Sequence, residues 1–358
     1  MGIIKKIAVG LLLVVSTTAQ AEVTLLVPQK VGGGTSVWAS IVATELEKYL
    51  DEKVVLKHIP SARDIGGFNY WHNNYKDRDD VIMVSHGGNG VSFLTEDVDY
   101  HYDEYDSVGL MNLNIIVAKR KDFERPVRFA AGSGMTPEAY AITMLECGPD
   151  LEVPQYIDCF KEKVVWVNGM SGGERRLAFR RGELNATREN PAAYKKHVEG
   201  DENAEIWFHH GILTDGKHVD DYNYQGYQFE ELFKEKWGVY PSGYMYDAYK
   251  LVKSFRDGMQ KALWVHKGNP RRQEYVDALI QVASNVESAK VITEKVGEYN
   301  WYTGDWGNKH RDDLMELINL PTMNVLIQFN RQALGLDSVL KQRLVLPPLC
   351  KGCNLIRG

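Results

Sequence analysis

VPQKVGGGT, residues 27–35, follows a short apolar run and precedes a helical pattern. The apolar residues of 23–27 predict a first β-strand, and apolar residues at helical spacing over 38–46 predict a helix directly behind the three glycines. A glycine-rich turn between a strand and a helix leaves backbone N–H groups free at the positive end of the helix dipole, and such a turn attracts anions. We therefore expect an anion to be bound by the N–H groups of Gly33, Gly34 and Thr35.

The first 21 residues have the three parts of a secretory signal. Lys5 and Lys6 form the positive part, residues 7–15 the apolar part, and Ala19-Gln20-Ala21 the cleavage site. The apolar part is shorter than the ~20 residues that a membrane-spanning helix needs. We expect cleavage near Ala21 and export of the mature chain, where a nutrient is the more natural anion than a nucleotide.

Length and charge limit the classes of function. The chain has 358 residues, more than the ~100–200 of one domain, which favours two domains. The formal charge of -6 and the lack of a dominant basic stripe argue against a nucleic-acid partner. A short basic run at helical spacing is expected to be a solvent-facing helix surface: Arg175, Arg176, Arg180 and Arg181.

Four cysteines fit an oxidising compartment. Cys147 and Cys159 bracket a loop rich in Gly, Pro and Asp, and we expect them to form a disulfide. Cys350 and Cys353 stand near the end of the chain, where no helix of a redox βαβ unit follows and no further zinc ligand is close in sequence. A small terminal disulfide loop is the favoured interpretation of this pair.

Strand-length apolar runs alternate with helical patterns, which predicts an α/β fold with largely parallel sheets. After the first strand, further strands are expected within 54–56, 81–84, 108–117, 127–130 and 164–167. Beyond Gln225 the chain shows few strand signals, and helices are expected over 275–286, 290–296 and 314–334. Several strands end in Gly, Ser and Asn just before a helix, and such ends form the ligand crevice of open α/β sheets.

No catalytic or metal motif is convincing. Residues 171–174, SGGE, resemble the signature of transporter ATPases, but no phosphate-binding G-x-x-x-x-G-K-[ST] loop accompanies them. Neither G-x-S-x-G nor H-E-x-x-H occurs. His209 and His210, with His218, are poor candidates for one metal site because adjacent strand residues point to opposite faces. We expect no enzymatic activity, no metal and no cofactor.

The ordered set of turns resembles the TctC or Bug-type periplasmic receptors of tripartite tricarboxylate transporters. The family's opening proline and glycine pair match Pro28 and Gly32–Gly34, and its second loop matches residues 58–66, HIPSARDIG. A strand with a Ser/Gly/Asn-rich end matches residues 81–89. Two later turns match residues 132–136 and 165–172, the second followed by Gly182-Glu183-Leu184-Asn185. Order and spacing are preserved from Val23 to Asn185.

This resemblance implies a two-domain Venus-flytrap fold, type II-like, with the ligand in a cleft between the domains. The domains expected from it are 22–118 with 249–358, and 119–248, after a signal peptide at 1–21. It also implies a monomeric periplasmic receptor that binds a small carboxylate through backbone amides and waters, and delivers it to membrane permease subunits.

The matched motifs and the glycine turn together give the expected ligand-binding residues. They are Gly33, Gly34, Thr35, Ser61, Ala62, Arg63, Ser85, Gly87, Asn89, Ser133, Met135, Thr136, Gly169, Met170 and Arg188.

The chain departs from the family pattern at several of these positions. Ser36 and Ser40 stand where the family has an aspartate and an arginine, and Arg63 and Asp64 replace glycines. Arg63 either bonds directly to the anion or faces solvent beside Asp64. The pattern leaves mono-, di- and tricarboxylates, amino acids and aromatic acids all open as ligands.

Two other functions remain open at this stage. One is an exported hydrolase that uses Ser85 or Ser133 as nucleophile, with His86 or His58 as base. The other is a binding protein that presents its ligand to a membrane sensor.

Overall fold

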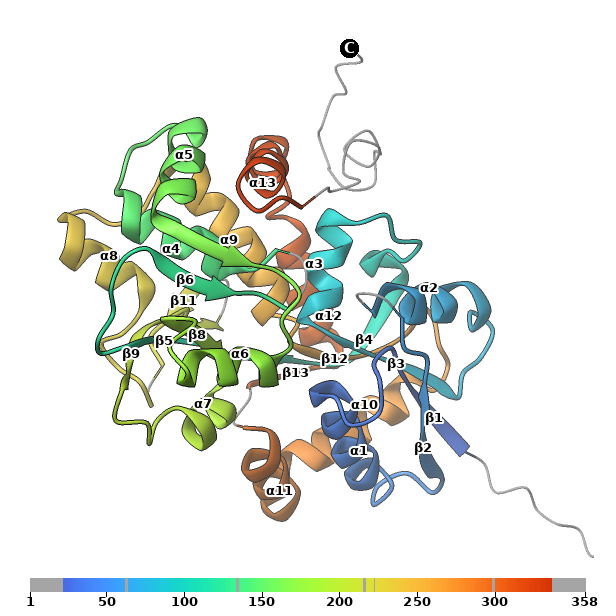
Figure 1. Cartoon of the computed structure of the whole chain (residues 1–358). Coiled ribbons are helices and arrows are strands. Elements are labelled where there is room, and N and C mark those ends of the chain that lie inside the picture. The colour runs from blue at the N-terminus through green and yellow to red at the C-terminus, as the bar shows by residue number, and fades with distance from the viewer. Residues whose placement is uncertain are drawn as a thin grey trace, which may run out of the picture.

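The computed structural model describes residues 22–61, 64–132, 135–214, 217–221, 223–297 and 300–336. Two groups of strands, each with its own helices, form a two-domain α/β fold (Figure 1). The expected signal peptide and the Cys350–Cys353 pair lie outside the described residues. Among the helices that are described, none combines the length and the apolar character needed to cross a bilayer.

The first domain is built on a six-stranded sheet with the order β13-β4-β12-β3-β1-β2. Its central strands β1 and β3 run parallel to each other and to β2, whereas β12 and β13 run antiparallel to their neighbours. The strands are β1 (Glu22–Val27), β2 (Lys53–His58), β3 (Val81–His86), β4 (Tyr105–Asn112), β12 (Lys261–His266) and β13 (Asn300–Thr303).

Helices cover both faces of this sheet. Alternate residues of β1 point to opposite faces, so that Val23, Leu25 and Val27 pack into one core and Leu26 into another. Residues of α1, α10 and α11 line the first core, and residues of α2 and α3 line the second. The helices of this domain are α1 (Gly34–Leu46), α2 (Ile65–Asn74), α3 (Gly87–Thr95), α10 (Arg272–Ser284), α11 (Val286–Val296) and α12 (Gly304–Met315), with a short 3-10 turn, η2 (Tyr102–Glu104).

The second domain contains smaller sheets. An antiparallel sheet has the order β8-β5-β9, β6 and β7 form a parallel pair, and β10 and β11 form a hairpin. These strands are β5 (Ile116–Arg120), β6 (Val127–Ala130), β7 (Val164–Val167), β8 (Ala186–Glu189), β9 (Ala204–His209), β10 (Ile212–Thr214) and β11 (Lys217–Val219).

Its helices gather on the left and at the top of Figure 1. They are α4 (Pro137–Cys147), α5 (Val153–Lys163), α6 (Gly172–Arg180), α7 (Pro191–His197), α8 (Phe229–Trp237), α9 (Gly243–Asp257) and α13 (Leu320–Gln332). The expected disulfide is confirmed, because Cys147 at the end of α4 is bonded to Cys159 in α5 with an S–S distance of 2.01 Å.

Two short segments, which lie side by side, connect the first domain to the second. Residues 113–115 lead from β4 into β5, and residues 258–260 lead from α9 back into β12. The N–H of Leu113 donates to the carbonyl of Asp257 at 3.1 Å, which ties the two segments together. The expected domain boundaries at 118 and 248 fall inside β5 and α9, and α13 packs on α5 and α9 of the second domain.

Several predicted elements differ from the structure. The sheets are less parallel than expected, because β12, β13 and the β8-β5-β9 sheet are antiparallel. The expected helix over 314–334 is two helices, since α12 ends at Met315 and Asn319 caps α13 by accepting the Thr322 N–H at 3.0 Å. Residues 108–117 contain the end of β4 and the start of β5.

Candidate functional site

The two domains face each other across a cleft of about 1310 Å³. The first domain lines it with Gly32 and Gly34 at the start of α1, with Lys261 of β12, and with residues at the end of α11. The second domain lines it with Arg176 of α6 and with most of α7. Leu113 and Gln260, one from each connecting segment, also border it. The cleft therefore lies where the predicted glycine turn meets the second domain.

The glycine turn begins α1 without a side-chain cap. Gly33 is the N-cap residue and no side chain accepts a hydrogen bond from the first turn in the usual capping position. The Gly33 N–H, one of the expected anion donors, donates to the Lys30 carbonyl at 3.2 Å, and Gln29 Oε1 takes the Thr35 N–H at a long 3.3 Å. Gly34 is exposed and lines the cleft, and its N–H, at the first position of α1, has no partner within the helix. Thr35 is buried, and its hydroxyl accepts a hydrogen bond from Lys261.

A hydrogen-bonded group stands beside this turn in the first domain. Asp64 Oδ2 lies 2.7 Å from His86 Nε2 and 2.9 Å from Gln29 Nε2. Because His86 Nδ1 accepts the Gly88 N–H at 3.0 Å, Nε2 carries the hydrogen and donates it to Asp64. Burial lowers the pKa of His86, which keeps the ring neutral. Gln29, Asp64 and His86 thus hold one another in place through hydrogen bonds.

Three of the expected ligand residues are occupied by the protein itself. Ser85 is fully buried and its hydroxyl accepts the indole N–H of Trp264 at 2.8 Å. The N–H of Gly87 points to Gln260, and Asn89 is fully buried, accepting the His86 N–H at 3.1 Å. These residues shape the turn after β3, and their polar groups are not available to a ligand.

The remaining expected residues have mixed surroundings. Met135 is buried, and its sulfur accepts hydrogen bonds from Tyr140 and Asn330. Thr136 is 1 % exposed, and its hydroxyl has no hydrogen-bond partner among the described residues. Gly169 has φ +92°, a left-handed conformation that suits glycine, and Met170 follows it. Ser61 Oγ accepts the Gly67 N–H at the start of α2, whereas Ala62, Arg63 and Ser133 lie outside the described residues.

Arginine side chains gather where the second domain approaches the first. Arg188 donates from Nη1 to Glu138 Oε1 at 2.9 Å, and both side chains are buried. Burial, and next the nearby Arg188, lower the pKa of Arg175 to about 10 and that of Arg256 to about 9. The expectation of a solvent-facing arginine surface is wrong for Arg175, which is 7 % exposed, while Arg180 and Arg181 are exposed.

Lys261 links this arginine group to the glycine turn. Its Nζ lies 3.1 Å from Thr35 Oγ1, and it lines the cleft. Burial and the neighbouring Arg256 lower its pKa to about 8. Burial disfavours the charged form of this lysine, and an anion bound beside it would stabilise that form.

The histidines that a hydrolase would need are engaged elsewhere. Both ring nitrogens of His86 are used, by Gly88 and Asp64. His58 Nε2 lies 2.8 Å from Ser36 Oγ, and no carboxylate of the described residues orients this pair. His209 and His210 bond to different partners, and no group of three or more His, Cys, Asp or Glu side chains in the described part of the chain is arranged to hold a metal ion.

Solved structures show what this arrangement is similar to. A TctC solute-binding protein from Polaromonas matches with a TM-score of 0.55 and 14% identity, over 86% of this chain and 98% of that one. The periplasmic binding protein BugD matches with a TM-score of 0.54 and 11% identity, over 87% and 97%. This chain has the fold of the TctC and Bug-type receptors.

A third structure of this TctC fold contains a ligand. The Rhodopseudomonas palustris protein with adipate matches with a TM-score of 0.56 and 12% identity, over 87% of this chain and 97% of that one. The Polaromonas protein is described as a solute-binding protein and BugD as a periplasmic binding protein. No protein-family model and no curated protein sequence matches the chain.

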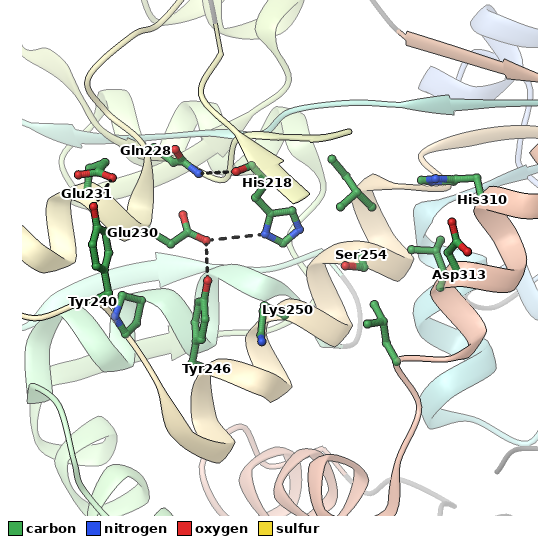
Figure 2. A pocket seen from close by; sticks show the side chains of 14 residues that line it. His218, Gln228, Glu230, Glu231, Tyr240, Tyr246, Lys250, Ser254, His310 and Asp313 are labelled. Atoms are coloured by element: carbon green, nitrogen blue, oxygen red, sulfur yellow. Dashed lines mark hydrogen bonds and ion pairs between the residues drawn. The ribbon is translucent and has the colours of Figure 1, made fainter. Parts of the chain in front are cut away.

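A second cavity, of about 550 Å³, lies among β10, β11, α8, α9 and α12. Figure 2 shows Glu230 between His218 and Tyr246, with Glu230 Oε1 3.7 Å from His218 Nδ1 and 3.2 Å from Tyr246 Oη. Burial lowers the pKa of His218 to about 4. None of the residues expected from the TctC resemblance lines this cavity, so we place the candidate site in the larger cleft.

Sequence reasoning missed Lys261, which lines the cleft, and the group of Arg175 and Arg256 whose charges act on it and on each other. Arg175 was assigned to a solvent-facing surface, and Arg256 sits on an amphipathic helix where an arginine gives no signal. Lys261 begins a strand that the sequence did not indicate. Only the contact between distant elements brings them together, and Arg188 was the one member of the group that the sequence singled out.

Proposed function

We propose that this protein is an extracytoplasmic receptor that captures a small organic anion bearing a carboxylate and delivers it to membrane permease subunits. The observation that carries the proposal is the cleft between the domains, where the uncapped start of α1 and Lys261 face a basic wall of the second domain. Backbone N–H groups at a helix start together with a half-buried cation form a site for a carboxylate.

The fold supports the same ligand class. One structure of this fold contains adipate, a dicarboxylate. In the present chain the carboxylate is expected to meet Gly34 and Thr35, as the glycine turn predicts, together with Lys261, which the sequence did not indicate. Ser61, Ala62, Arg63 and the turns at 133–136 and 169–170 complete the proposed surroundings of the ligand.

We propose a binding role without catalysis. A nucleophilic serine needs a neighbouring base with a free nitrogen, and the ring nitrogens of His86 are already bonded. Ser85 is fully buried against Trp264, which removes the first nucleophile that the sequence suggested.

Ligand capture would close the two domains about the connecting segments at 113–115 and 258–260. Hinge closure of this kind turns binding into a change of shape that a permease can recognise. Export by a signal peptide at residues 1–21, a monomeric state and a division into two domains belong to the same proposal.

A thermal-shift screen of the mature protein tests the proposal. Organic acids are compared with neutral sugars, and an acid at one hundred times its dissociation constant should add about 2.7 kcal/mol to the free energy of unfolding. The expected result is a rise in Tm with at least one carboxylate and with no sugar. A rise with neutral sugars and with no acid would overturn the proposed function.

A further inference from the structure

The cavity of about 550 Å³ among β10, β11, α8, α9 and α12 has no role in the proposed function. It shares no lining residue with the cleft at the start of α1. One of its walls, formed by residues of α12, belongs to the first domain, and the others belong to the second domain. Small-molecule sites have volumes of about 300–1,000 Å³, so the cavity is large enough to hold a ligand of its own.

Carboxylates outnumber cations on the walls of this cavity. Glu230, Glu231 and Asp313 line it, together with one lysine, Lys250. Lys250 is paired with Asp247 at 2.9 Å, and Asp247 does not line the cavity. The lining therefore favours a positively charged ligand over an anion.

Two of the three carboxylates already have partners at the surface. Asp313 lies 2.6 Å from Lys309, and Glu231 accepts a hydrogen bond from Tyr240 Oη at 2.9 Å. Both carboxylates also reach solvent, where water completes their hydrogen bonds. These two residues give the cavity its charge, and neither lacks a donor.

Glu230 is different, because it is 9 % exposed and short of donors. Figure 2 shows its carboxylate among the lining side chains, between His218 and Tyr246. Oε1 accepts a hydrogen bond from Tyr246 Oη at 3.2 Å, whereas His218 Nδ1, at 3.7 Å, is too far away for one. Oε2 is buried with no hydrogen-bond partner among the described residues. Buried carboxylate oxygens are normally hydrogen-bonded, so Glu230 has room for a further donor.

The surroundings of Glu230 keep it ionised without satisfying its oxygens. Burial by itself would raise its pKa, but the neighbouring His218 and Lys253 bring the pKa down to about 2. Lys253 is 1 % exposed and does not line the cavity, and its Nζ has no hydrogen-bond partner within the described ranges. Lys253 thus stabilises the charge of Glu230 without donating to its oxygens.

The rest of the cavity suits a hydrocarbon group. Apolar side chains come from both domains, and two tyrosine rings stand beside them. These residues are Leu213, Tyr240, Pro241, Tyr246, Leu314 and Leu317.

We propose that this cavity binds a small organic amine, with its ammonium group at Glu230 and its hydrocarbon body against the leucine side chains. An ammonium group carries three donors and a positive charge, which match a carboxylate that lacks donors. The inference goes beyond the proposed function and does not depend on it, because the cavity and the cleft have no residue in common.

Amines and alcohols with the same carbon skeleton test this site. Phenethylamine is compared with phenethyl alcohol, and hexylamine with hexanol, by calorimetric titration of the mature protein. At least one amine should bind about tenfold tighter or more than its alcohol, because charge-assisted hydrogen bonds contribute that much. Failure of both amines to bind, or equal affinity for amine and alcohol, would overturn the inference and leave the proposed function intact.

Glu230→Gln keeps the size of the side chain and removes its charge. The variant should lose the preference for the amine over the alcohol. Glu235→Gln is the matched control, because Glu235 is exposed on the same helix, α8, and does not line the cavity. An undiminished preference in Glu230→Gln would show that Glu230 does not hold the ammonium group, and would overturn the inference.

Leu317→Trp tests the same site without changing a buried charge. Leu317 is 39 % exposed at the cavity, so an indole should fill the space and leave the Tm within about 2 °C of the wild type. Amine affinity should fall about tenfold or more. Ile280→Trp is the control, because Ile280 is equally exposed and lies on α10, outside the cavity. Unchanged amine affinity in Leu317→Trp would place the amine elsewhere and contradict the inference.

Discussion

At the scale of single residues, Asp64 shows how the turns beside the start of α1 are held. It precedes α2 with a left-handed φ of 60°, which costs a non-glycine residue about 1–2 kcal/mol. Its Oδ2 accepts hydrogen bonds from His86 and Gln29, and these offset the backbone cost. The TctC pattern has glycine here, so the chain has exchanged a relaxed backbone for a hydrogen-bonded carboxylate.

Two substitutions separate these contributions. Asp64→Ala loses the hydrogen bonds and keeps the left-handed backbone, and should lower the free energy of unfolding by about 2 kcal/mol. Asp64→Gly loses the same bonds but relaxes the backbone, and should cost about 1 kcal/mol less. Urea denaturation measures both values, and equal costs for the two variants would contradict strain at this position.

Buried histidines predict the acid sensitivity of the fold. His266 stacks on Trp71 with ring centroids 4.1 Å apart, and burial lowers its pKa to about 4, as it does for His218. Because these pKa values lie below the unfolded value of about 6.5, the unfolded chain binds more protons in this range. The histidine contribution to stability is therefore present above pH 6.5 and is lost as the pH falls towards 4.

Asp257 acts in the opposite direction. Burial raises its pKa to about 7, so protonation of this carboxyl between pH 7 and 4 favours the folded state. Two histidines, His266 and His218, destabilise the fold in this range and one carboxyl stabilises it, so Tm should fall as the pH is lowered from 6.5 to 4.

His266→Phe isolates one titrating group. The variant should reduce the loss of unfolding free energy over this pH range by roughly 1–3 kcal/mol. Urea denaturation at several pH values checks it, and an unchanged pH dependence would show that His266 does not titrate as its burial requires.

Local features of the chain were predictable from the sequence, and the charges near the cleft were not. The glycine turn and the Cys147–Cys159 pair are encoded within a few residues, so their composition is enough to predict them. Arg175, Arg256 and Lys261 are brought together by the packing of α6, α9 and β12, and no local pattern reports that packing.

At the scale of elements, the start of α1 is the feature on which binding depends. A Cβ on Gly34 meets nothing within 4 Å, and its φ is not in the left-handed region, so valine fits the free protein. Its methyl groups would project into the cleft and keep an anion away from the backbone N–H groups.

Gly34→Val should therefore weaken acid binding tenfold or more, with the Tm within about 2 °C of the wild type. Gly200→Val is a matched control, because Gly200 is an exposed turn residue of the second domain with open space around it. Unimpaired binding by Gly34→Val would place the anion elsewhere.

The disulfide joins α4 and α5 across a sequence separation of 12 residues. Closing a loop of this length should stabilise the fold by about 3 kcal/mol through the entropy of the unfolded chain. The double variant Cys147→Ser, Cys159→Ser should lose about that amount in urea denaturation and keep its acid affinity. An unchanged midpoint would contradict this role.

Element prediction succeeded where the local pattern was decisive. β6 and β7 have the bounds that their apolar runs predict. β12 was missed because it is buried in the middle of the sheet, so it shows no polar alternation, and its neighbours β3 and β4 define it as a strand. The break between α12 and α13 carries a readable signal, Asn319 before Pro321.

At the scale of the whole molecule, the order of strand, turn and helix units predicted the fold. Five matched turns over the first half of the chain indicated the TctC architecture, although identity to the solved structures is only 11–14%. Topology depends on the order of such units and tolerates most substitutions. The ligand depends on a few side chains, which is why the fold was predicted further than the ligand.

Closure of the domains gives a prediction at this scale. Residues of α1, α7 and α11 line the cleft between the domains. The two connecting segments lie side by side, as a hinge requires. Small-angle X-ray scattering should show a smaller radius of gyration when a tight-binding acid is added. Gly34→Val should show no contraction at the same acid concentration. An identical contraction of the wild type and the variant would show that closure does not depend on an anion bound at the start of α1.

The central claim is that an anion, held at the start of α1, is what the cleft binds. The most direct test is calorimetric titration of the mature protein with the acid that gives the largest Tm shift and with the amide of the same acid. The account predicts one acid bound per chain and no measurable binding of the neutral amide. Equal affinity for the acid and the amide would contradict it.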